Sequence, residues 1–447
     1  MKKLLFFIAI FILTACTSNN KKVPVTPETA LERYLSNSDD NYKWEVKESF
    51  DLDGLTAVDI LLTSQNWRDH IWTHQLTLFI PDEVHYDGAL LFITGGSVKN
   101  GLPNWNSIDD EWSQNFARVA LKNKGVVAIV RQTPNQPLYN DLVEDELISF
   151  TLHNFKQDND YTWPLLFPMV KTAVRAMDAV QEYCEENLES KITRFTVSGA
   201  SKRGWTTWLT ASQDERVEAI GPMVIDVLNM PVSLDYHLEA WDEYSIQIED
   251  YTKLEIPQSV NTESGNAIST MVDPYSYRKS LSMPKMIFIG TNDEYWPVDA
   301  VKNYIDEIPG ENYIHYVPNA GHDLGGGEQA LKALSAFWGR TLEKDDYPDY
   351  SYTISADSTF ATLHLSYEVD ELKNIYMWSA VSTDRDFRDE EWSAETVVFE
   401  ENKIAPQIHF PEKGYKAFYI DLEYQDPKGG TYTKSTRMYV VNSDEVL

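Results

Sequence analysis

The chain has 447 residues and a formal net charge of −32, from 38 Lys and Arg against 70 Asp and Glu. Such an acidic balance repels phosphate backbones and anionic lipid headgroups, so it argues against nucleic acid and charged membrane surfaces as partners. Hydrophobic residues make up 43%, which is enough for a large core and excludes wholesale disorder. Two Cys cannot form a disulfide framework, and no Cys and His cluster has zinc spacing, so we expect neither a metal nor a cofactor.

The N-terminus has the pattern of an export signal. Two lysines precede an apolar run over residues 4–13, which is far shorter than the roughly 20 residues needed to span a bilayer. The run ends in LTAC, which resembles the lipobox of bacterial lipoproteins. We therefore predict a signal peptide over 1–15, acylation of Cys16 and a tether over 16–28. The protein would then lie in the cell envelope, on the periplasmic or surface side, held to the membrane by lipid alone. The alternative is an ordinary signal peptide that is cleaved elsewhere.

From about residue 85 to 340, apolar runs alternate with helical patterns. The runs are continuous, as is typical of parallel strands that are covered on both faces. Residues 168–188 and 328–342 have the i, i+3, i+4, i+7 spacing of an apolar helix face. This rhythm predicts an α/β doubly wound sheet. Its predicted strands cover residues 89–96, 126–132, 192–199, 217–226, 284–290 and 312–318.

The flanking regions are rich in β patterns. Residues 43–80 predict antiparallel strands added to the edge of the sheet. After residue 344 the helical patterns stop, and short alternating runs predict a small all-β sandwich over 345–447. The α/β domain would span 29–344. Two long aromatic and acidic insertions, near 133–165 and 227–282, are expected to form lids or other functional insertions.

The run ITRFTVSGASKRGWTTWL, residues 192–209, has the layout of a nucleophile elbow. A buried strand leads through Gly199 to Ser201, and the next residues continue as a helix. This turn exposes the Ser hydroxyl at a helix N-terminus, where backbone amides favour negative charge. The motif departs from G-x-S-x-G, because Arg203 stands where the second glycine belongs and Gly204 follows it. The turn must tolerate the larger side chain or widen. The alternative is a Ser that only satisfies a strand–helix turn.

A Ser nucleophile needs a His base and a carboxylate that orients the base. Of the nine His, His322 has the best position, in a glycine-containing loop after the last predicted strand and on the same sheet edge as Ser201. Asp293 follows the preceding strand, which gives the order nucleophile, acid, base. Glu294 and Asp226 are the alternative acids.

The surroundings of Ser201 suggest further site residues. We expect the backbone amides of Lys202 and Gly96 to form the oxyanion hole, with Gly95 and Ser97 as alternatives to Gly96. The side chains of Lys202 and Arg203 would either attract an anionic substrate or pair with nearby carboxylates. Five tryptophans are candidates for an aromatic pocket, with core packing as the alternative: Trp105, Trp163, Trp205, Trp241 and Trp296.

Three segments resemble the PhoPQ-activated pathogenicity-related protein family: VSGASKRGWTTWL, MVDPYSYRKSLSMPKMIFIGTNDEYW and YVPNAGHDLGG. The resemblance covers most of residues 30–440. It implies an α/β-hydrolase domain, distantly similar to prolyl-oligopeptidase-type peptidases, and a β-rich tail. On that pattern Ser201, Asp293 and His322 fall on the triad positions. The family name records a regulon and an association with virulence, not a substrate.

These patterns together predict an exported, lipid-anchored serine hydrolase that cleaves an ester or amide bond through an acyl-enzyme. Its partner would be a small-molecule or peptide substrate, with no cofactor. Two alternatives stay open. One is a hydrolase-fold binding or signalling protein, associated with virulence, that has lost turnover. The other is a carbohydrate-processing esterase whose β-rich tail binds glycans.

Overall fold

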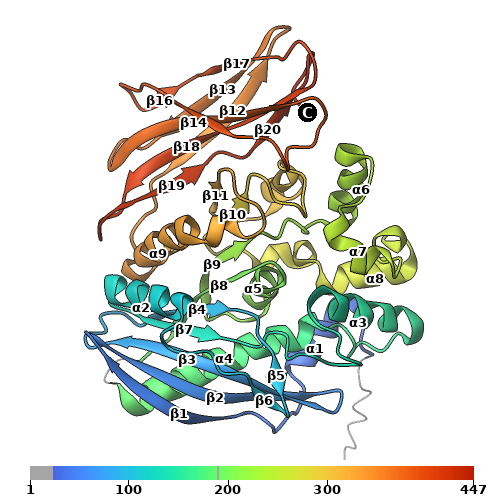
Figure 1. Cartoon of the computed structure of the whole chain (residues 1–447), viewed down its shortest axis with the longest axis vertical. Helices are drawn as coiled ribbons and strands as arrows, with labels where there is room; N and C mark the ends of the chain where they lie inside the picture. The colour runs from blue at the N-terminus through green and yellow to red at the C-terminus, as the bar shows by residue number, and fades with distance from the viewer. Residues whose placement is uncertain (1–23, 189–190) are drawn as a thin grey trace, which may run out of the picture.

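The computed structural model describes residues 24–188 and 191–447. The predicted signal peptide, Cys16 and most of the predicted tether lie outside these residues. Figure 1 shows an elongated molecule, with the first strands at one end and the C-terminal strands at the other. Within the described residues, no helix combines the length and the apolar character needed to cross a bilayer.

One mixed sheet runs through the molecule. Its first part is the antiparallel meander that residues 43–80 predicted, formed by β1 (Lys43–Leu52), β2 (Leu55–Trp67) and β3 (His70–Pro81). β3 pairs antiparallel with β7, and from β7 to β11 every pairing is parallel. The parallel strands, in spatial order, are β7 (Val126–Val130), β4 (Gly88–Ile93), β8 (Arg194–Ala200), β9 (Val217–Met223), β10 (Lys285–Gly290) and β11 (Asn312–Val317).

The parallel strands are buried on both faces, which explains their continuous apolar sequences. In β4, Leu91 points into one core and Leu90 and Phe92 into the other. The first core includes residues of α4 (Leu166–Asn187) and α5 (Lys202–Gln213), and the second includes residues of α2 (Glu111–Asn123) and α9 (Glu328–Glu343). This strand order with helices on both faces is the α/β-hydrolase fold, as the sequence predicted.

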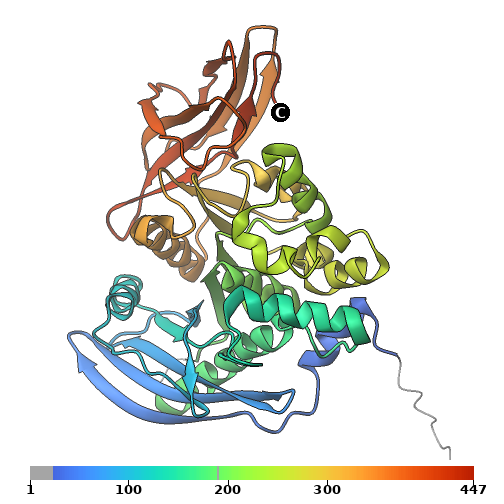
Figure 2. The ribbon, with the colours of Figure 1, turned by 45° about the vertical axis from the view of Figure 1, so that its right-hand side comes forward.

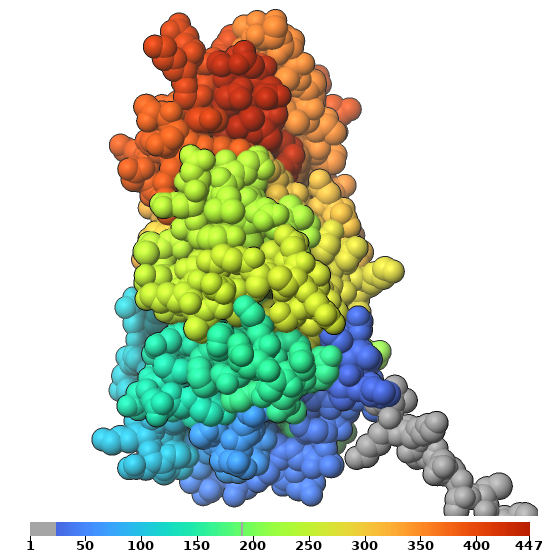
Figure 3. Space-filling view, turned by 90° about the vertical axis from the view of Figure 1, so that its right-hand side faces the viewer, coloured from blue at the N-terminus to red at the C-terminus, as the bar shows by residue number. Residues whose placement is uncertain are grey.

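The two long insertions lie beside one another at the carboxyl ends of the parallel strands. The first contains α3 (Glu144–Asp158), which contacts α7 and α8 of the second. In Figures 2 and 3 they stack on one side of the molecule, with α3 in teal and the second insertion in yellow-green. The helices of the second insertion are α6 (Met230–Trp241), α7 (Glu249–Thr252) and α8 (Glu263–Val272), with 3₁₀ turns η1 (Ile246–Ile248), η2 (Pro257–Ser259) and η3 (Pro274–Ser280).

The C-terminal β region continues the main sheet, which the alternating sequence pattern did not reveal. β19 pairs antiparallel with β11, where Ser435 lies opposite Ile314. The main sheet then continues through β19 (Thr431–Ser435), β18 (Tyr415–Gln425), β14 (Leu372–Ser382) and β15 (Ser393–Thr396), and β20 (Tyr439–Val441) also pairs with β18. A second sheet packs against it, formed by β12 (Tyr350–Ala356), β13 (Phe360–Tyr367), β16 (Lys403–Ile404) and β17 (Gln407–His409).

Several short elements complete the described fold, among them the 3₁₀ turns η4 (Ala300–Asn303) and η5 (Ile305–Glu307) between β10 and β11. α1 (Pro27–Leu35) packs on α8 and α4. The hairpin of β5 (Val98–Lys99) and β6 (Leu102–Pro103) follows β4. The loop between β11 and α9, where the sequence predicts the His base, holds the 3₁₀ turn η6 (Leu324–Gly326).

Candidate functional site

Ser201 lies at the turn between β8 and α5, above the carboxyl edge of the sheet. Its φ of 58° and ψ of −128° are unfavourable for a residue with a side chain. Its amide donates to the carbonyl of Met223 at 2.9 Å, and its carbonyl accepts from the Trp205 amide at 2.9 Å. A strained serine on a sharp strand-to-helix turn is the geometry of a nucleophile elbow.

The elbow stays tight although Arg203 replaces the expected glycine. A Cβ on Gly204 would lie 2.8 Å from the Met223 carbonyl oxygen, and a Cβ on Gly199 would lie 2.9 Å from that of Ile93. The Arg203 side chain leaves the turn, since its Nε donates to the Thr133 carbonyl at 2.6 Å. Glycine is therefore needed at 199 and 204, and the turn accommodates the larger side chain at 203.

His322 is oriented by Asp293. Its Nδ1 lies 2.9 Å from one carboxylate oxygen of Asp293 and 3.1 Å from the other. The two alternative acids accept hydrogen bonds from groups other than the His322 ring. Glu294 accepts from the backbone amide of His322 at 2.9 Å, and Asp226 accepts from the Tyr304 hydroxyl. Burial raises the pKa of Asp226 to about 7, so it is poorly suited to act as a carboxylate at neutral pH.

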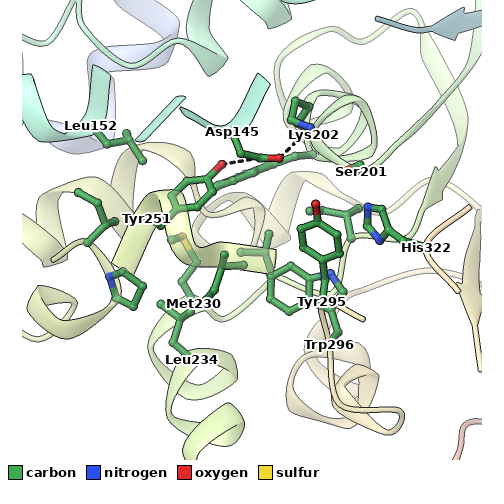
Figure 4. A pocket seen from close by; sticks show the side chains of 16 residues that line it. Asp145, Leu152, Ser201, Lys202, Met230, Leu234, Tyr251, Tyr295, Trp296 and His322 are labelled. Carbon is green, nitrogen blue, oxygen red and sulfur yellow. Dashed lines mark hydrogen bonds and ion pairs between the residues drawn. The ribbon is translucent and has the colours of Figure 1, made fainter. Parts of the chain in front are cut away.

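Ser201 and His322 line the same cavity (Figure 4). The Nε2 atom of His322 is buried and has no hydrogen-bond partner among the described residues. The ring of Tyr295 stacks on the imidazole, with centroids 4.0 Å apart and planes at 29°. Sequence reasoning missed Tyr295; its place two residues after Asp293 is the signal that would have found it. In Figure 4 its hydroxyl points toward the side of the cavity where Ser201 and Asp145 lie.

The cavity wall is largely apolar, and both insertions contribute to it. The cavity is narrow, with a volume of about 50 Å³. Such a narrow, apolar space suits a small uncharged group. Its apolar and aromatic lining is Leu152, Trp205, Ile225, Val227, Met230, Leu234, Ile248, Tyr251, Ile256, Pro257, Tyr295 and Trp296.

Of the five tryptophan candidates, Trp205 and Trp296 line this cavity and the other three lie elsewhere. Trp105 is exposed and borders a groove next to β1. The guanidinium groups of Arg68 and Arg388 stack over Trp163 and Trp241 respectively.

The two cations beside Ser201 are paired with carboxylates at the start of α3. Lys202 Nζ lies 2.9 Å from Glu144 and 3.0 Å from Asp145, and Arg203 binds both oxygens of Glu144. Asp145 also accepts from the Tyr251 hydroxyl at 2.9 Å. Burial alone would raise the pKa of Glu144, but the hydrogen bonds and charges of Arg203 and Lys202 lower it to about 2. The sequence left open whether these cations attract an anionic substrate or pair with nearby carboxylates. The structure therefore supports pairing with carboxylates of the protein.

Gly96 lies in a different hollow from Ser201. Gly95 and Gly96 border a pocket with Trp112 and Arg131. A Cβ on Gly95 would lie 2.7 Å from the Arg203 guanidinium, so the loop after β4 packs against the elbow's own side chain. The structure thus places the loop beside the elbow, without placing Gly96 on the wall of the cavity that holds Ser201.

The residue types that bind metals do not form a site in the described part of the chain. No group of three or more His, Cys, Asp and Glu side chains in residues 24–188 and 191–447 is arranged to hold a metal ion. Cys184 is buried in α4, and burial raises the pKa of its thiol to about 12.

The family model described as PhoPQ-activated pathogenicity-related protein matches residues 31–388. The chain belongs to this family. The resemblance carried by the three sequence segments is therefore confirmed. This family member is 28% identical over 458 residues to autocrine proliferation repressor protein A of Dictyostelium discoideum, an alignment that covers 95% of the chain and 90% of the relative.

Solved structures similar to this family member include esterases. Acetyl xylan esterase from Paenibacillus sp. R4 has 14% identity and a TM-score of 0.48, over 69% of this chain and 92% of that one. Acetyl xylan esterase 1 from Thermoanaerobacterium sp. JW/SL YS485 has 18% identity and a TM-score of 0.47, over 70% and 93%. Similarities this distant do not indicate a substrate.

Proposed function

We propose that this protein is a serine hydrolase that cleaves an ester or amide bond through an acyl-enzyme. One observation carries the proposal: Ser201, strained at the elbow, shares a cavity with His322, whose Nδ1 contacts Asp293 while its Nε2 is unpartnered. A carboxylate at Nδ1 favours the tautomer with its proton there, which leaves Nε2 free to accept the Ser proton.

In this mechanism, Ser201 Oγ attacks the substrate carbonyl while His322 Nε2 takes its proton. Asp293 stabilises the resulting imidazolium, and His322 then protonates the leaving alkoxide or amine. Water attacks the acyl-enzyme by the same proton route and frees Ser201. No hydrogen bond joins the Ser201 and His322 side chains in the described structure. Such bonds often tighten only in the substrate complex.

The oxyanion hole would use the Lys202 amide, which opens α5 beside the nucleophile. The sequence predicts that the loop with Gly95 and Gly96 supplies the second backbone amide of the oxyanion hole. The Tyr295 hydroxyl is a further donor on the cavity wall. Burial, with the nearby negative charges of Asp145 and Asp293, raises the pKa of Tyr295 to about 12, so this hydroxyl stays protonated at neutral pH.

A fluorophosphonate probe tests the proposal directly. The wild type should be labelled covalently on the peptide that contains Ser201, and Ser201→Ala should not be labelled. Ser212→Ala is the matched control, because Ser212 lies at the far end of α5, where its hydroxyl bonds the Leu209 carbonyl and the Gln213 side chain. A folded wild type that resists the probe, or equal labelling of Ser201→Ala, would contradict the proposal.

A binding or signalling role without turnover is the second candidate. The small volume of the cavity favours it, since little room is left for a substrate beside Ser201. The name of the Dictyostelium relative, a proliferation repressor, is in keeping with such a role. A panel of peptide, acyl-ester and glycan-ester substrates on probe-reactive protein would separate the candidates.

We also propose that the mature chain is anchored through lipid on Cys16 in the cell envelope. The lysines, the apolar run and LTAC at the N-terminus support this proposal. Labelled palmitate should enter the wild type and not Cys16→Ser. Cys184→Ser, which changes the one other Cys, should keep the label. Undiminished labelling of Cys16→Ser would overturn the proposed anchor.

A further inference from the structure

Residues 383–392, which join β14 to β15, leave the C-terminal β region and enter the α/β part. We call them the clamp loop. Phe387 and Trp392 are each 2% exposed and belong to the core that also holds Trp296 of the cavity wall. Two buried aromatic anchors fix the loop in place, because removing either would leave a cavity in a close-packed core.

The clamp loop holds the residue before the acid. The side-chain amide of Asn292 lies within hydrogen-bond distance of three carbonyls of the loop: Glu390 at 2.8 Å, Arg388 at 3.2 Å and Phe387 at 3.3 Å. Asn292 directly precedes Asp293. The position of Asn292 therefore determines where the backbone places the side chain of Asp293.

The clamp loop also holds the segment that carries the base. Asn319, three residues before His322, makes a reciprocal pair with Trp392: its Nδ2 donates to the Trp392 carbonyl at 3.0 Å, and its Oδ1 accepts from the Trp392 amide at 2.7 Å. The Thr291 hydroxyl accepts from the Asn319 amide at 2.8 Å and donates to Asn292 Oδ1 at 2.8 Å. The two segments are thus bound to each other and to one loop of the C-terminal region.

The third contact of the clamp loop is α6, which we call the lid helix because this part of the second insertion lines the cavity. Arg385 donates to Glu239 at 3.0 Å and to the Tyr236 hydroxyl at 2.6 Å. The Arg388 guanidinium lies 4.1 Å from the centroid of the Trp241 ring. α6 supplies Met230 and Leu234 to the cavity wall. In Figures 1 and 3 the yellow-green insertion accordingly lies against the C-terminal strands.

We infer that the clamp loop positions the acid, the base and the lid, so that the C-terminal β region is a working part of the active site. The inference rests on the proposed hydrolase function. Asn292 and Asn319 are positioning residues, because they touch the backbone of the clamp loop and not the reacting atoms. Small displacements of a His–carboxylate pair are costly, since about 1 Å of misplacement can lower a rate by about 100-fold.

The test compares Asn292→Ala and Asn319→Ala in the full chain. Each variant should lower the rate of fluorophosphonate labelling, and kcat for an ester substrate, by about 10- to 100-fold, with KM within about twofold of wild type. The amides of residues 319–325 should also exchange hydrogen faster in both variants. Asn312→Ala is the matched control. Its amide likewise donates to a carbonyl, that of Ile308, but at the end of β11 remote from His322.

Arg385→Ala gives a second, different readout. It removes the two Arg385 contacts with α6 without touching the Asp293 or His322 segments, so KM should rise about 3- to 10-fold while kcat changes little. A kcat effect for the asparagines and a KM effect for the arginine would not arise from a general loss of stability. Melting temperatures of all four variants show whether stability explains the changes.

The possible results separate the role of the clamp loop from the proposed hydrolase function. Labelling and exchange at wild-type levels in Asn292→Ala and Asn319→Ala would overturn the clamp. Losses as large in Asn312→Ala would do the same. An unreactive wild type would overturn the proposed function itself, while the exchange rates would still decide whether the clamp loop holds the two segments.

Discussion

Replacement of Asp293 by Asn should lower kcat/KM for an activated ester by about 10⁴-fold. The amide keeps the size of the carboxylate but can turn its NH₂ group toward His322 Nδ1, which lies 2.9 Å from the carboxylate in the wild type. The tautomer with a proton on Nε2 then becomes favourable, and that nitrogen can no longer accept the Ser201 proton. Steady-state kinetics with a chromogenic ester, on protein with an unchanged circular dichroism spectrum, measures the loss.

Asp226→Asn is the matched control for this substitution. Asp226 is a buried acid near Asp293 whose pKa is raised to about 7 by burial, and it bonds the Tyr304 hydroxyl. Asparagine mimics its protonated form, so kcat/KM should stay within about threefold of wild type. The opposite result, with activity lost in Asp226→Asn and retained in Asp293→Asn, would reverse the assignment of the acid.

The arrangement of the three candidate residues follows from the order of elements along the chain. Ser201, Asp293 and His322 each lie in the turn or loop that follows a strand with a continuous apolar sequence. Parallel strands end at one edge of the sheet, so a reader of the sequence expects the three loops to meet there. The periodicity of the strands and the small residues of the elbow carry this information locally.

What the sequence did not reveal depends on contacts between distant segments. Glu144 and Lys202 are far apart in the chain, and only the packing of α3 brings them to 2.9 Å. The pairing of Ser435 with Ile314, which adds β19 and the strands beyond it to the parallel part of the main sheet, likewise has no local signature. Alternation shows which face of a strand is buried, but it does not show which strand lies beside it.

The clamp loop went unnoticed for a related reason. Asn292 and Asn319 are ordinary loop residues in the sequence, and their partners are backbone carbonyls and amides about 70 to 100 residues away. When a side chain binds a backbone group, the type of the partner residue is not constrained, so the sequence does not indicate the contact. The sequence therefore presented the β region as a separate module, whereas in the structure one of its loops holds both candidate catalytic segments.

Replacement of Glu144 by Ala should lower the free energy of unfolding by about 2–3 kcal/mol. Arg203 and Lys202, with side chains 11% and 7% exposed, would lose the carboxylate that neutralises them. A fully buried pair broken in this way costs about 3–5 kcal/mol. The smaller value is expected here because 36% of the Glu144 side chain is exposed and Asp145 still faces Lys202. Urea unfolding at pH 7 measures the difference.

The pH dependence of this difference has a fixed sign. The pKa of Glu144 falls from 4.5 to about 2 on folding, chiefly through Arg203 and Lys202 acting against burial. Its contribution is therefore complete above about pH 5 and disappears as the pH falls toward 2. Wild type and Glu144→Ala should converge in stability over that range. Parallel stability curves down to pH 2 would contradict the role given to this carboxylate.

Two further variants separate charge from packing. Glu146→Ala, on the exposed face of the same helix, should change stability by less than about 0.5 kcal/mol. Arg203→Met in the Glu144→Ala background should recover part of the loss, because it removes the unpaired buried cation. Recovery would show that Glu144 is needed to neutralise the arginine that stands in the elbow where glycine is expected. Without recovery, the loss would come from packing at the start of α3, and the ion pair would not explain how the elbow tolerates Arg203.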